Sequence, residues 1–249
     1  MNRKEELVKE VVELIKQGGI VAFTGAGISV ESGIPPFRGA KGLWTKYNPE
    51  EYAYIETFIK NPEKVWMMLR EMYQCFKEAK PNPAHLVLAE LENRGYLEAV
   101  ITQNIDNLHQ KAGSKKVIEL HGSGESLVCL NCGKKYRFTE EFLKMFPCPK
   151  CEKCGKALKP EIVFFGEPLP EEALNQAFEL IKRCKALIII GTSGVVYPAA
   201  YLPYEAKRSG AKIIEVNPEE SAYTESITDY FFKERAGEFF EEFKRFLEG

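Results

Sequence analysis

The chain has 249 residues, of which 45% are hydrophobic and 28% are charged, and its formal net charge at pH 7 is -2. A chain of this length can bury a sizeable core and suits one large domain, or a large and a small one. The near-neutral charge removes any strong electrostatic case for nucleic acid or an anionic membrane as a partner. No apolar run approaches the roughly 20 residues of a membrane span and the N-terminus lacks an apolar signal core, so we expect a cytoplasmic protein.

The first predicted elements are a helix and a buried strand that runs into glycines. Apolar residues recur at helical spacing over residues 5–17, and residues 20–24 form a short apolar run. Gly25 and Gly27 follow the strand directly, where the backbone could approach a pyrophosphate at the start of a helix. The dinucleotide-binding fingerprint is incomplete because Val30 stands in place of the third glycine. An ordinary tight turn between strand and helix explains the glycines equally well.

An aromatic and charged stretch separates this turn from the next strand. Residues 40–79 predict a helical insertion that lies over the ligand edge of the sheet. The helix that follows is amphipathic, and we expect Leu86, Leu88 and Leu91 on its apolar side. His85, at the start of this helix, is expected to have a structural role.

Polar residues follow the next two predicted strands. The first strand runs into Gln103, Asn104 and Asp106, and the second ends at His121. Ligands bind beyond the carboxyl ends of strands in parallel α/β sheets, so we expect the chemistry at these side chains. An unperturbed pKa of about 6.5 suits His121 as a general base, with a capped core histidine as the alternative. His109 lies in a helical run, where packing or an intrahelical hydrogen bond is expected.

Five of the seven cysteines lie close together in C-x-x-C spacings, which predicts a metal site rather than disulfides. Cys129-Leu-Asn-Cys132 and Cys151-Glu-Lys-Cys154 are both followed by Gly-Lys, a pair of knuckles typical of tetrahedral zinc. Cys148 also lies at a workable spacing, so a Cys148/Cys151 pair is the alternative. We expect one zinc ion on Cys129, Cys132, Cys151 and Cys154. Four thiolates leave no coordination position open for water, so this zinc should be structural.

The C-terminal part of the chain repeats the pattern of strand and helix. Apolar strands are predicted over residues 160–165, 185–190 and 211–216, and each ends in glycine or a hydrogen-bonding residue. A short strand and an amphipathic helix follow over residues 229–249. We therefore expect an α/β fold with a Rossmann-like parallel sheet.

The predicted domains alternate along the chain. Residues 1–39, 80–122 and 160–249 are expected to form the Rossmann-like domain. Residues 40–79 add a helical insertion, and residues 123–159 add a zinc-ribbon module. Both insertions must pack against one sheet because no low-complexity linker separates the pieces, and together they make the smaller domain.

Motifs along nearly the whole chain resemble, in their order, those of the sirtuin family of NAD-dependent protein deacylases. The motifs are Gly25-Ala-Gly-Ile-Ser29, Gly33-Ile-Pro-x-Phe37-Arg38-Gly39, Thr102-Gln-Asn-Ile-Asp106, Leu120-His121-Gly122, the cysteine knuckles, Phe164-Phe-Gly-Glu167 and Gly191-Thr-Ser193. The short chain without extensions resembles the prokaryotic members of the family.

The resemblance implies NAD as co-substrate, held by the Rossmann-like domain. A mobile loop with Phe37 and Arg38 would cover the nicotinamide ribose, and Gln103, Asn104 and Asp106 would line the nicotinamide pocket. The residues implied to bind NAD are Gly25, Ala26, Gly27, Phe37, Arg38, Gln103, Asn104, Ile105, Asp106, Gly191, Thr192, Ser193, Asn217, Pro218 and Ala236.

The reaction implied by the resemblance removes an acyl group from lysine. The acyl oxygen attacks C1′ of the nicotinamide ribose, nicotinamide leaves, and His121 then activates a ribose hydroxyl against the resulting imidate. Asn104 is the second residue implied to be catalytic. The products would be free lysine, nicotinamide and O-acyl-ADP-ribose.

The substrate implied is an acyl-lysine protein or peptide, with no direct nucleic-acid or membrane partner. Its backbone would add as a strand beside Gly166 and Gly194, which reads little sequence. Val163 would belong to the same substrate site. Phe165 and Val195 would flank the lysine stem.

The chain departs from patterns of the family at three places, which are Pro36, Gly194 and the acyl pocket. Pro36 stands where many sirtuins have Asp or Thr, which stiffens the loop, and Gly194 replaces a common Leu or Ala, which is expected to loosen peptide docking. Members that remove succinyl groups carry a Tyr and an Arg three residues apart, whereas Leu69 and Met72 match those positions here. A buried carboxylate would lack a partner, so we expect acetyl or longer apolar acyl groups.

Three alternatives stay open at the level of sequence. The same scaffold could act as a mono-ADP-ribosyltransferase. A register shifted toward Arg70 and Tyr73 would instead make the chain a desuccinylase or demalonylase. A non-catalytic zinc-ribbon protein that binds nucleic acid or a partner is the third alternative.

Overall fold

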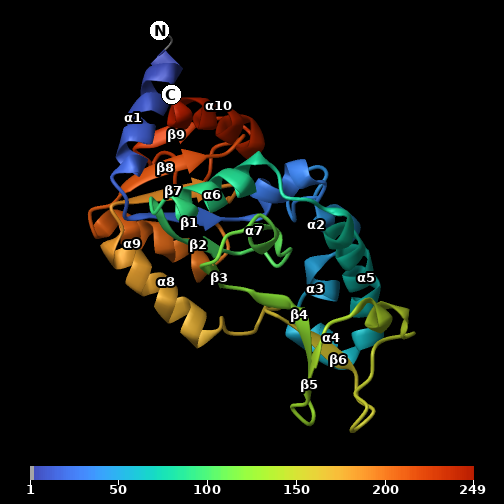
Figure 1. Ribbon diagram of the computed structural model, residues 1–249. Helices are drawn as coiled ribbons and strands as arrows, with labels where there is room; N and C mark the ends of the chain where they lie inside the picture. Colours follow the sequence, from blue (N-terminus) through green and yellow to red (C-terminus); the bar gives the residue numbers. More distant parts are fainter. Residues whose placement is uncertain (1–2) are drawn as a thin grey trace.

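The computed structural model describes residues 3–249, in which a six-stranded sheet forms the centre of the larger part of the molecule (Figure 1). All strands run parallel, in the order β3-β2-β1-β7-β8-β9. Strand order reverses between β1 and β7, where α/β sheets open a crevice at the carboxyl ends of the strands. The strands are β1 (Ile20–Thr24), β2 (Leu97–Thr102), β3 (Val117–Glu119), β7 (Ala186–Ile190), β8 (Lys212–Val216) and β9 (Tyr230–Phe232).

Helices cover both faces of this sheet, and the strand side chains alternate between them. On β1, Val21 and Phe23 pack toward α8 and α9, whereas Ile20 and Ala22 pack toward α1, α6 and α10. Strands buried on both faces explain the continuous apolar runs in the sequence. The helices are α1 (Arg3–Lys16), α6 (Pro83–Asn93), α8 (Glu171–Arg183), α9 (Leu202–Arg208) and α10 (Ala236–Glu248).

Helix α6 is rotated relative to the sequence prediction. Leu88 and Leu91 are buried as expected, but Leu86 is 51% exposed, so its predicted place on the apolar side is wrong. His85 is fully buried and shares the core-facing stripe with Leu88 and Leu91 at intervals of three residues. The capping box between Asn82 and His85 sets this orientation where the helix begins.

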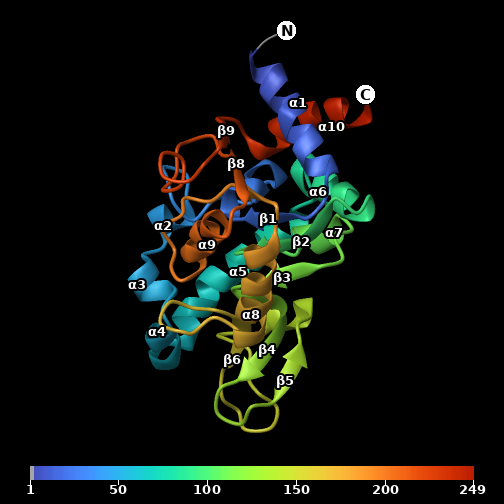
Figure 2. The same ribbon diagram turned by 90° about the vertical axis from the view of Figure 1, so that its left-hand side faces the viewer.

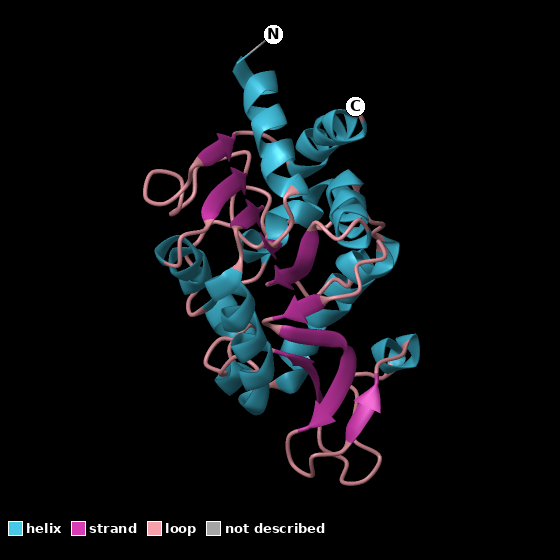
Figure 3. Cartoon of the chain, turned by 60° about the vertical axis from the view of Figure 1, so that its left-hand side comes forward, coloured by secondary structure: helices cyan, strands magenta, loops and turns pink. Residues whose placement is uncertain are grey.

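The predicted helical insertion is present and packs against a small antiparallel sheet. Its helices are α2 (Leu43–Lys46), α3 (Pro49–Tyr52), α4 (Ile55–Lys60) and α5 (Pro62–Glu78). The small sheet has the order β5-β4-β6, with β4 (Gly122–Cys129), β5 (Lys135–Arg137) and β6 (Leu158–Ile162). Apolar side chains of α4, α5, β4 and β6 form a core of their own. Figures 2 and 3 show the small sheet at the end of the molecule opposite α1 and α10, which confirms an α/β fold with an inserted cysteine-bearing module.

Two elements differ from the sequence prediction. The strand expected over residues 160–165 begins at Leu158, ends at Ile162 and pairs antiparallel with β4, so it belongs to the small sheet and crosses the predicted boundary at residue 160. The helix after β1 is the 3-10 helix η1 (Ala26–Ser32) rather than an α-helix. The division into two domains stays a prediction.

One short α-helix and two further 3-10 helices complete the secondary structure of residues 3–249. They are α7 (Leu108–Lys111), η2 (Glu140–Lys144) and η3 (Ala199–Tyr201), beside η1. In residues 3–249, none of the helices combines the length and the apolar character that crossing a bilayer requires.

Candidate active site

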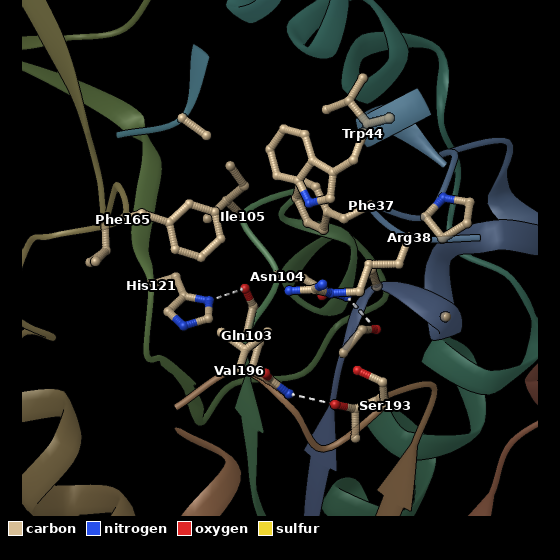
Figure 4. A pocket seen from close by; sticks show the side chains of 18 of the residues that line it. Phe37, Arg38, Trp44, Gln103, Asn104, Ile105, His121, Phe165, Ser193 and Val196 are labelled. Carbon is tan, nitrogen blue, oxygen red and sulfur yellow. Dashed lines mark hydrogen bonds between the residues drawn. The ribbon is translucent and has the colours of Figure 1, made fainter. Parts of the chain in front are cut away.

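A cleft of about 420 Å³ opens where β1, β2, β7 and β8 end (Figure 4). Turns that follow these strands form one wall, and α2, α5 and the segment after β6 form the other. Motifs from distant parts of the sequence therefore meet at one site. The predicted site residues that line the cleft are Gly25, Ala26, Gly27, Phe37, Arg38, Gln103, Asn104, Ile105, His121, Val163, Phe165, Gly166, Gly191, Thr192, Ser193, Asn217 and Pro218.

The glycines after β1 and β7 let two loops touch through their backbones. A Cβ atom on Gly27 would lie 2.6 Å from the Cα atom of Gly191, and one on Gly191 would lie 2.2 Å from the backbone nitrogen of Ile28. Side chains at these positions would force the loops apart. The glycines therefore serve both purposes that the sequence suggested: they allow a tight turn, and they expose backbone to the cleft that both loops line.

Amide side chains after β2 tie this motif to the loops after β1 and β7. Asn104 is buried and donates from Nδ2 to the backbone oxygen of Gly25 over 3.0 Å. Gln103 donates from Nε2 to Oγ1 of Thr192 over 3.1 Å. The bonds hold both amides in fixed positions on the cleft wall.

Asp106 lies behind the cleft rather than on its wall. It lines a smaller adjoining cavity together with Ser29, Ile34 and Cys75. Ser29 donates from Oγ to the Asp106 carboxylate over 2.6 Å, and the other carboxylate oxygen accepts from the backbone nitrogen of Leu108. Burial raises the pKa of Asp106 above its ordinary value, and these hydrogen bonds oppose that shift. The adjoining cavity shares Asn104 and Ile105 with the cleft, so Asp106 is one layer away from it.

His121 lies between β3 and β4 with one ring nitrogen fixed by the backbone (Figure 4). Nδ1 is 2.9 Å from the backbone oxygen of Gln103, and since that oxygen can only accept, Nδ1 carries the hydrogen. Nε2 of the neutral ring is then an acceptor. Burial lowers the pKa of His121 below its ordinary value, so the ring is neutral at pH 7 and able to take a proton.

Besides Asp106, three of the residues predicted to bind cofactor or substrate lie outside the cleft lining. Ala236 is buried at the start of α10. Val195 is 48% exposed beside the cleft, whose wall there is formed by Val196. Gly194 has φ +74°, and a Cβ atom on it would lie 2.8 Å from the Tyr223 ring. Glycine is therefore required here by the packing of Tyr223.

Trp44 is a cleft residue that sequence reasoning missed. Its ring stacks on Phe37 with centroids 5.2 Å apart and lies 6.4 Å from the ring of Phe165, so it joins the loop after η1 to the segment after β6. One aromatic residue among many in residues 40–79 carries no motif that could have identified it.

The apolar end of the cleft is formed by α5. Leu69 and Met72 line it together with Met68. Arg70 turns to the other side of the helix and donates to the backbone oxygens of residues 143, 145 and 147 over 3.0, 2.7 and 3.0 Å. Tyr73 donates from its hydroxyl to the backbone oxygen of Gly124 over 2.9 Å. Arg70 and Tyr73, the residues that a shifted register would place in the acyl pocket, are therefore hydrogen-bonded to the small module instead.

The four predicted cysteines form a compact cluster at the tip of the small module. The Sγ atoms of Cys129, Cys132, Cys151 and Cys154 all lie within 4.8 Å of one another. Tetrahedral zinc with Zn–S distances of about 2.3 Å needs sulfur separations of roughly 3.8 Å, so the donor set fits one structural zinc. Cys148 is buried nearby but is not a member of the cluster, which favours the predicted pairing.

The buried histidines are expected to make stability depend on pH. Burial lowers the pKa of His85 to about 4, and it also lowers that of His109, whose ring centroid is 5.0 Å away. Below pH 6.5 His85 binds a proton in the unfolded chain but stays neutral in the folded protein. The free energy of unfolding therefore falls on acidification. This contribution should fall by about 2 kcal/mol between pH 7 and pH 5. Urea unfolding of the wild type and of His85→Gln at both pH values checks this, and equal pH slopes would contradict it.

Comparison with known proteins agrees with this geometry. Residues 25–198 match the model of the Sir2 family. An NAD-dependent protein deacylase of Pyrococcus abyssi is 50% identical over 238 residues, which cover 93% of this chain and 94% of that relative. A solved structure described as "Structural Basis for the Mechanism and Regulation of Sir2 Enzymes" is 47% identical with a TM-score of 0.91 and covers 98% of both chains. A Sir2–p53 peptide–NAD+ complex is 42% identical with a TM-score of 0.86 and covers 95% of this chain and 97% of the other. The resemblance seen in the motifs is confirmed, and the chain belongs to the Sir2 family.

Proposed function

We propose that this chain is an NAD-dependent protein deacylase that removes acetyl or other apolar acyl groups from lysine side chains. The products are free lysine, nicotinamide and O-acyl-ADP-ribose. The observation that carries the proposal is the neutral His121 ring, held by Gln103 in the same cleft as the glycine loops and the apolar wall of α5. The relatives named as deacylases and the Sir2 complex with a peptide and NAD+ support it.

The donor set of the cleft fits NAD. The backbone loops at Gly25–27 and Gly191–193 suit a pyrophosphate, and the amides of Gln103 and Asn104 suit the nicotinamide end. When bound, NAD would supply C1′ of a ribose, whose bond to nicotinamide breaks as a bond to the acyl oxygen forms. Phe37, Trp44 and Phe165 keep water from this carbon, because their rings pack side by side over the cleft.

His121 is proposed as the general base. Its Nε2 atom accepts the proton of a ribose hydroxyl, while the Nδ1 hydrogen bond to Gln103 holds the ring in the required tautomer. Asn104 is the second catalytic residue and positions the reacting groups through a side chain already fixed on Gly25. Asp106 supports the nicotinamide end from behind through Ser29.

The acyl-lysine polypeptide is proposed to lie as a strand between the segments at Gly166 and Gly194. The backbone of Phe165 is already paired with residues 53 and 55 on one edge, so an incoming strand uses the other edge. Phe165 and Val163 line the passage to the apolar end formed by Leu69 and Met72.

We expect acetyl-lysine peptides to react at least about tenfold faster than succinyl-lysine peptides, because a buried carboxylate would lie against Leu69 and Met72 without a cation. Met72→Arg should raise kcat/KM for the succinyl peptide and lower it for the acetyl peptide. Met67→Arg is the matched control, since Met67 is 62% exposed on the same helix. Faster desuccinylation by the wild type would show that the acyl pocket has been assigned wrongly.

The proposed function is tested by measuring nicotinamide release from NAD with and without an acetyl-lysine peptide. Release that requires the peptide, with O-acetyl-ADP-ribose detected by mass spectrometry, is the expected result. ADP-ribose attached to a protein would instead identify a mono-ADP-ribosyltransferase on this scaffold. If the chain does not bind NAD, the result would favour the third alternative, a non-catalytic zinc-ribbon protein.

We also propose where the protein acts and how it is divided. Cysteine thiolates that hold zinc are kept reduced in the cytoplasm, which we take as its location.

Residues 40–79 and 123–159 are proposed as the smaller domain, and the rest as the Rossmann-like NAD-binding domain, with β6 contributing its last residues to the small sheet.

A further inference from the structure

A buried carboxylate at the end of β8 is surrounded by neutral hydrogen-bond donors. Glu215 is fully buried, and burying a carboxylate costs free energy unless its oxygens are hydrogen-bonded. Lys207 on α9 and Lys212 on the same strand pair with Asp229 instead. The donors to Glu215 are Asn217 Nδ2 at 2.9 Å, Thr224 Oγ1 at 3.1 and 3.0 Å, Thr228 Oγ1 at 2.7 Å and Ser221 Oγ.

All of these donors belong to residues 217–228, a segment whose first part lines the cleft. Residues 217–220 form the cleft wall, and Asn217 Nδ2 also donates to the backbone oxygen of Thr192 over 3.2 Å. Further along, the backbone nitrogen of Ala222 donates to the backbone oxygen of Ser193 over 3.1 Å. Glu215 therefore joins the end of β8 to the loop after β7 on the cofactor side of the cleft.

The carboxylate also decides which end of the Asn217 amide faces the ligand. Both oxygens of Glu215 accept hydrogen bonds, the Asn217 amide nitrogen points toward one of them, and its N–H groups are taken by Glu215 and the backbone oxygen of Thr192. The amide oxygen is left for the cleft. A carbonyl oxygen accepts from a hydroxyl group and is repelled by a phosphate group. Glu219 and Glu220 on the same wall add negative charge to that repulsion.

We propose that Glu215 is a positioning residue for the nucleotide half of NAD. It orients Asn217 so that the cleft takes a ribose hydroxyl and rejects a ribose 2′-phosphate. The inference rests on the proposed function, because it assumes that an ADP-ribose moiety occupies this end of the cleft.

The test compares the affinities for ADP-ribose and for 2′-phospho-ADP-ribose by calorimetry. Glu215→Met removes the acceptor and frees the Asn217 amide to turn, so ADP-ribose should bind about tenfold more weakly. The preference for ADP-ribose over its 2′-phosphate should fall by a similar factor. Glu215→Gln keeps a carbonyl oxygen for Asn217 and should stay within about twofold of the wild type. Glu225→Gln is the matched control, since Glu225 is exposed on the same segment.

The outcomes separate this role from general support of the segment and from failure of the proposed function. If Glu215→Met binds ADP-ribose and its 2′-phosphate with the same ratio of affinities as the wild type, whether or not both bind more weakly, the proposed role of Glu215 is wrong. Should Glu215→Met unfold, Glu215→Asp replaces it: the shorter side chain cannot reach Asn217 and the segment together, and a preference equal to that of the wild type would again overturn the role. A wild-type protein that binds neither ligand would overturn the proposed function itself.

Discussion

Replacing Cys151 with alanine is expected to release the zinc ion and lower deacylation by more than about a hundredfold, while ADP-ribose still binds within a few-fold of the wild-type affinity. Cys151 belongs to the compact cluster of four thiols, and three ligands cannot close a structural site. Metal content measured by atomic absorption, deacylation rate and ADP-ribose calorimetry on the same preparation check the three parts of this expectation.

Loss of zinc is expected to affect deacylation but not ADP-ribose binding because α5 is attached to the cysteine-bearing module. Trp66 donates from its indole nitrogen to the backbone oxygen of Leu158 over 2.9 Å, and Arg70 and Tyr73 bond to backbone oxygens of the same module. Leu69 and Met72 of the same helix form the apolar wall of the cleft. Disordering the module therefore displaces the acyl wall, whereas the turns after β1 and β7 belong to the larger sheet and stay in place.

Cys148→Ala is the matched control for the metal site. Cys148 is buried in the core of the module, so its removal leaves a small cavity that lowers stability modestly. Its sulfur is not among the clustered thiols, and one equivalent of zinc should remain bound. Loss of zinc from Cys148→Ala together with its retention in Cys154→Ala would reverse the ligand assignment, because Cys151 is a ligand in both pairings.

The sequence predicted best where a single local motif determines both structure and chemistry. The knuckles around Cys129 and Cys154 indicated one metal cluster because four thiols at that spacing have few other uses, and the cluster is present. His121 and Asn104 were expected at the ligand edge because polar residues that end buried strands meet at one edge of a parallel sheet, and both line the cleft.

Prediction failed where tertiary packing decides. The strand predicted over residues 160–165 could join either a parallel sheet or a small antiparallel one, and the choice depends on β4, which is far away in the sequence. The rotation of α6, which exposes Leu86, follows from a cap that no periodicity reveals. The glycine at 194 was read as a loss of peptide docking, yet Tyr223, distant along the chain, leaves no room for a side chain there.

Buried polar groups were the least accessible to sequence reasoning. Glu215 stands in an apolar strand where its charge would argue for solvent exposure, and only the donors of residues 217–228 make its burial tolerable. Its neighbour Asn217 was expected to bind the cofactor, but the orientation of its amide depends on hydrogen bonds to Glu215 and to the distant backbone oxygen of Thr192, which form only in the folded sheet.

The second large effect is expected from His121→Ala, which should lower formation of O-acyl-ADP-ribose by about a thousandfold. Departure of nicotinamide requires no proton acceptor, whereas activation of the ribose hydroxyl does. Exchange of labelled nicotinamide into NAD in the presence of the acetyl peptide should therefore persist in this variant. Asn104→Ala should instead lower both exchange and product formation, because the amide positions the groups that react first.

His109→Gln is the control that separates a base in the cleft from a histidine in the core. His109 is buried beside Thr24, 2.8 Å from its hydroxyl, and does not line the cleft, so this variant should lose stability and keep most of its activity at temperatures where it is folded. Parallel loss of exchange and product formation in His121→Ala would mean that His121 orders the cleft instead of accepting a proton.

The acid limb of kcat/KM gives an independent check: because burial lowers the pKa of His121, activity should be retained as the pH is lowered to 6.5 and decline only below it.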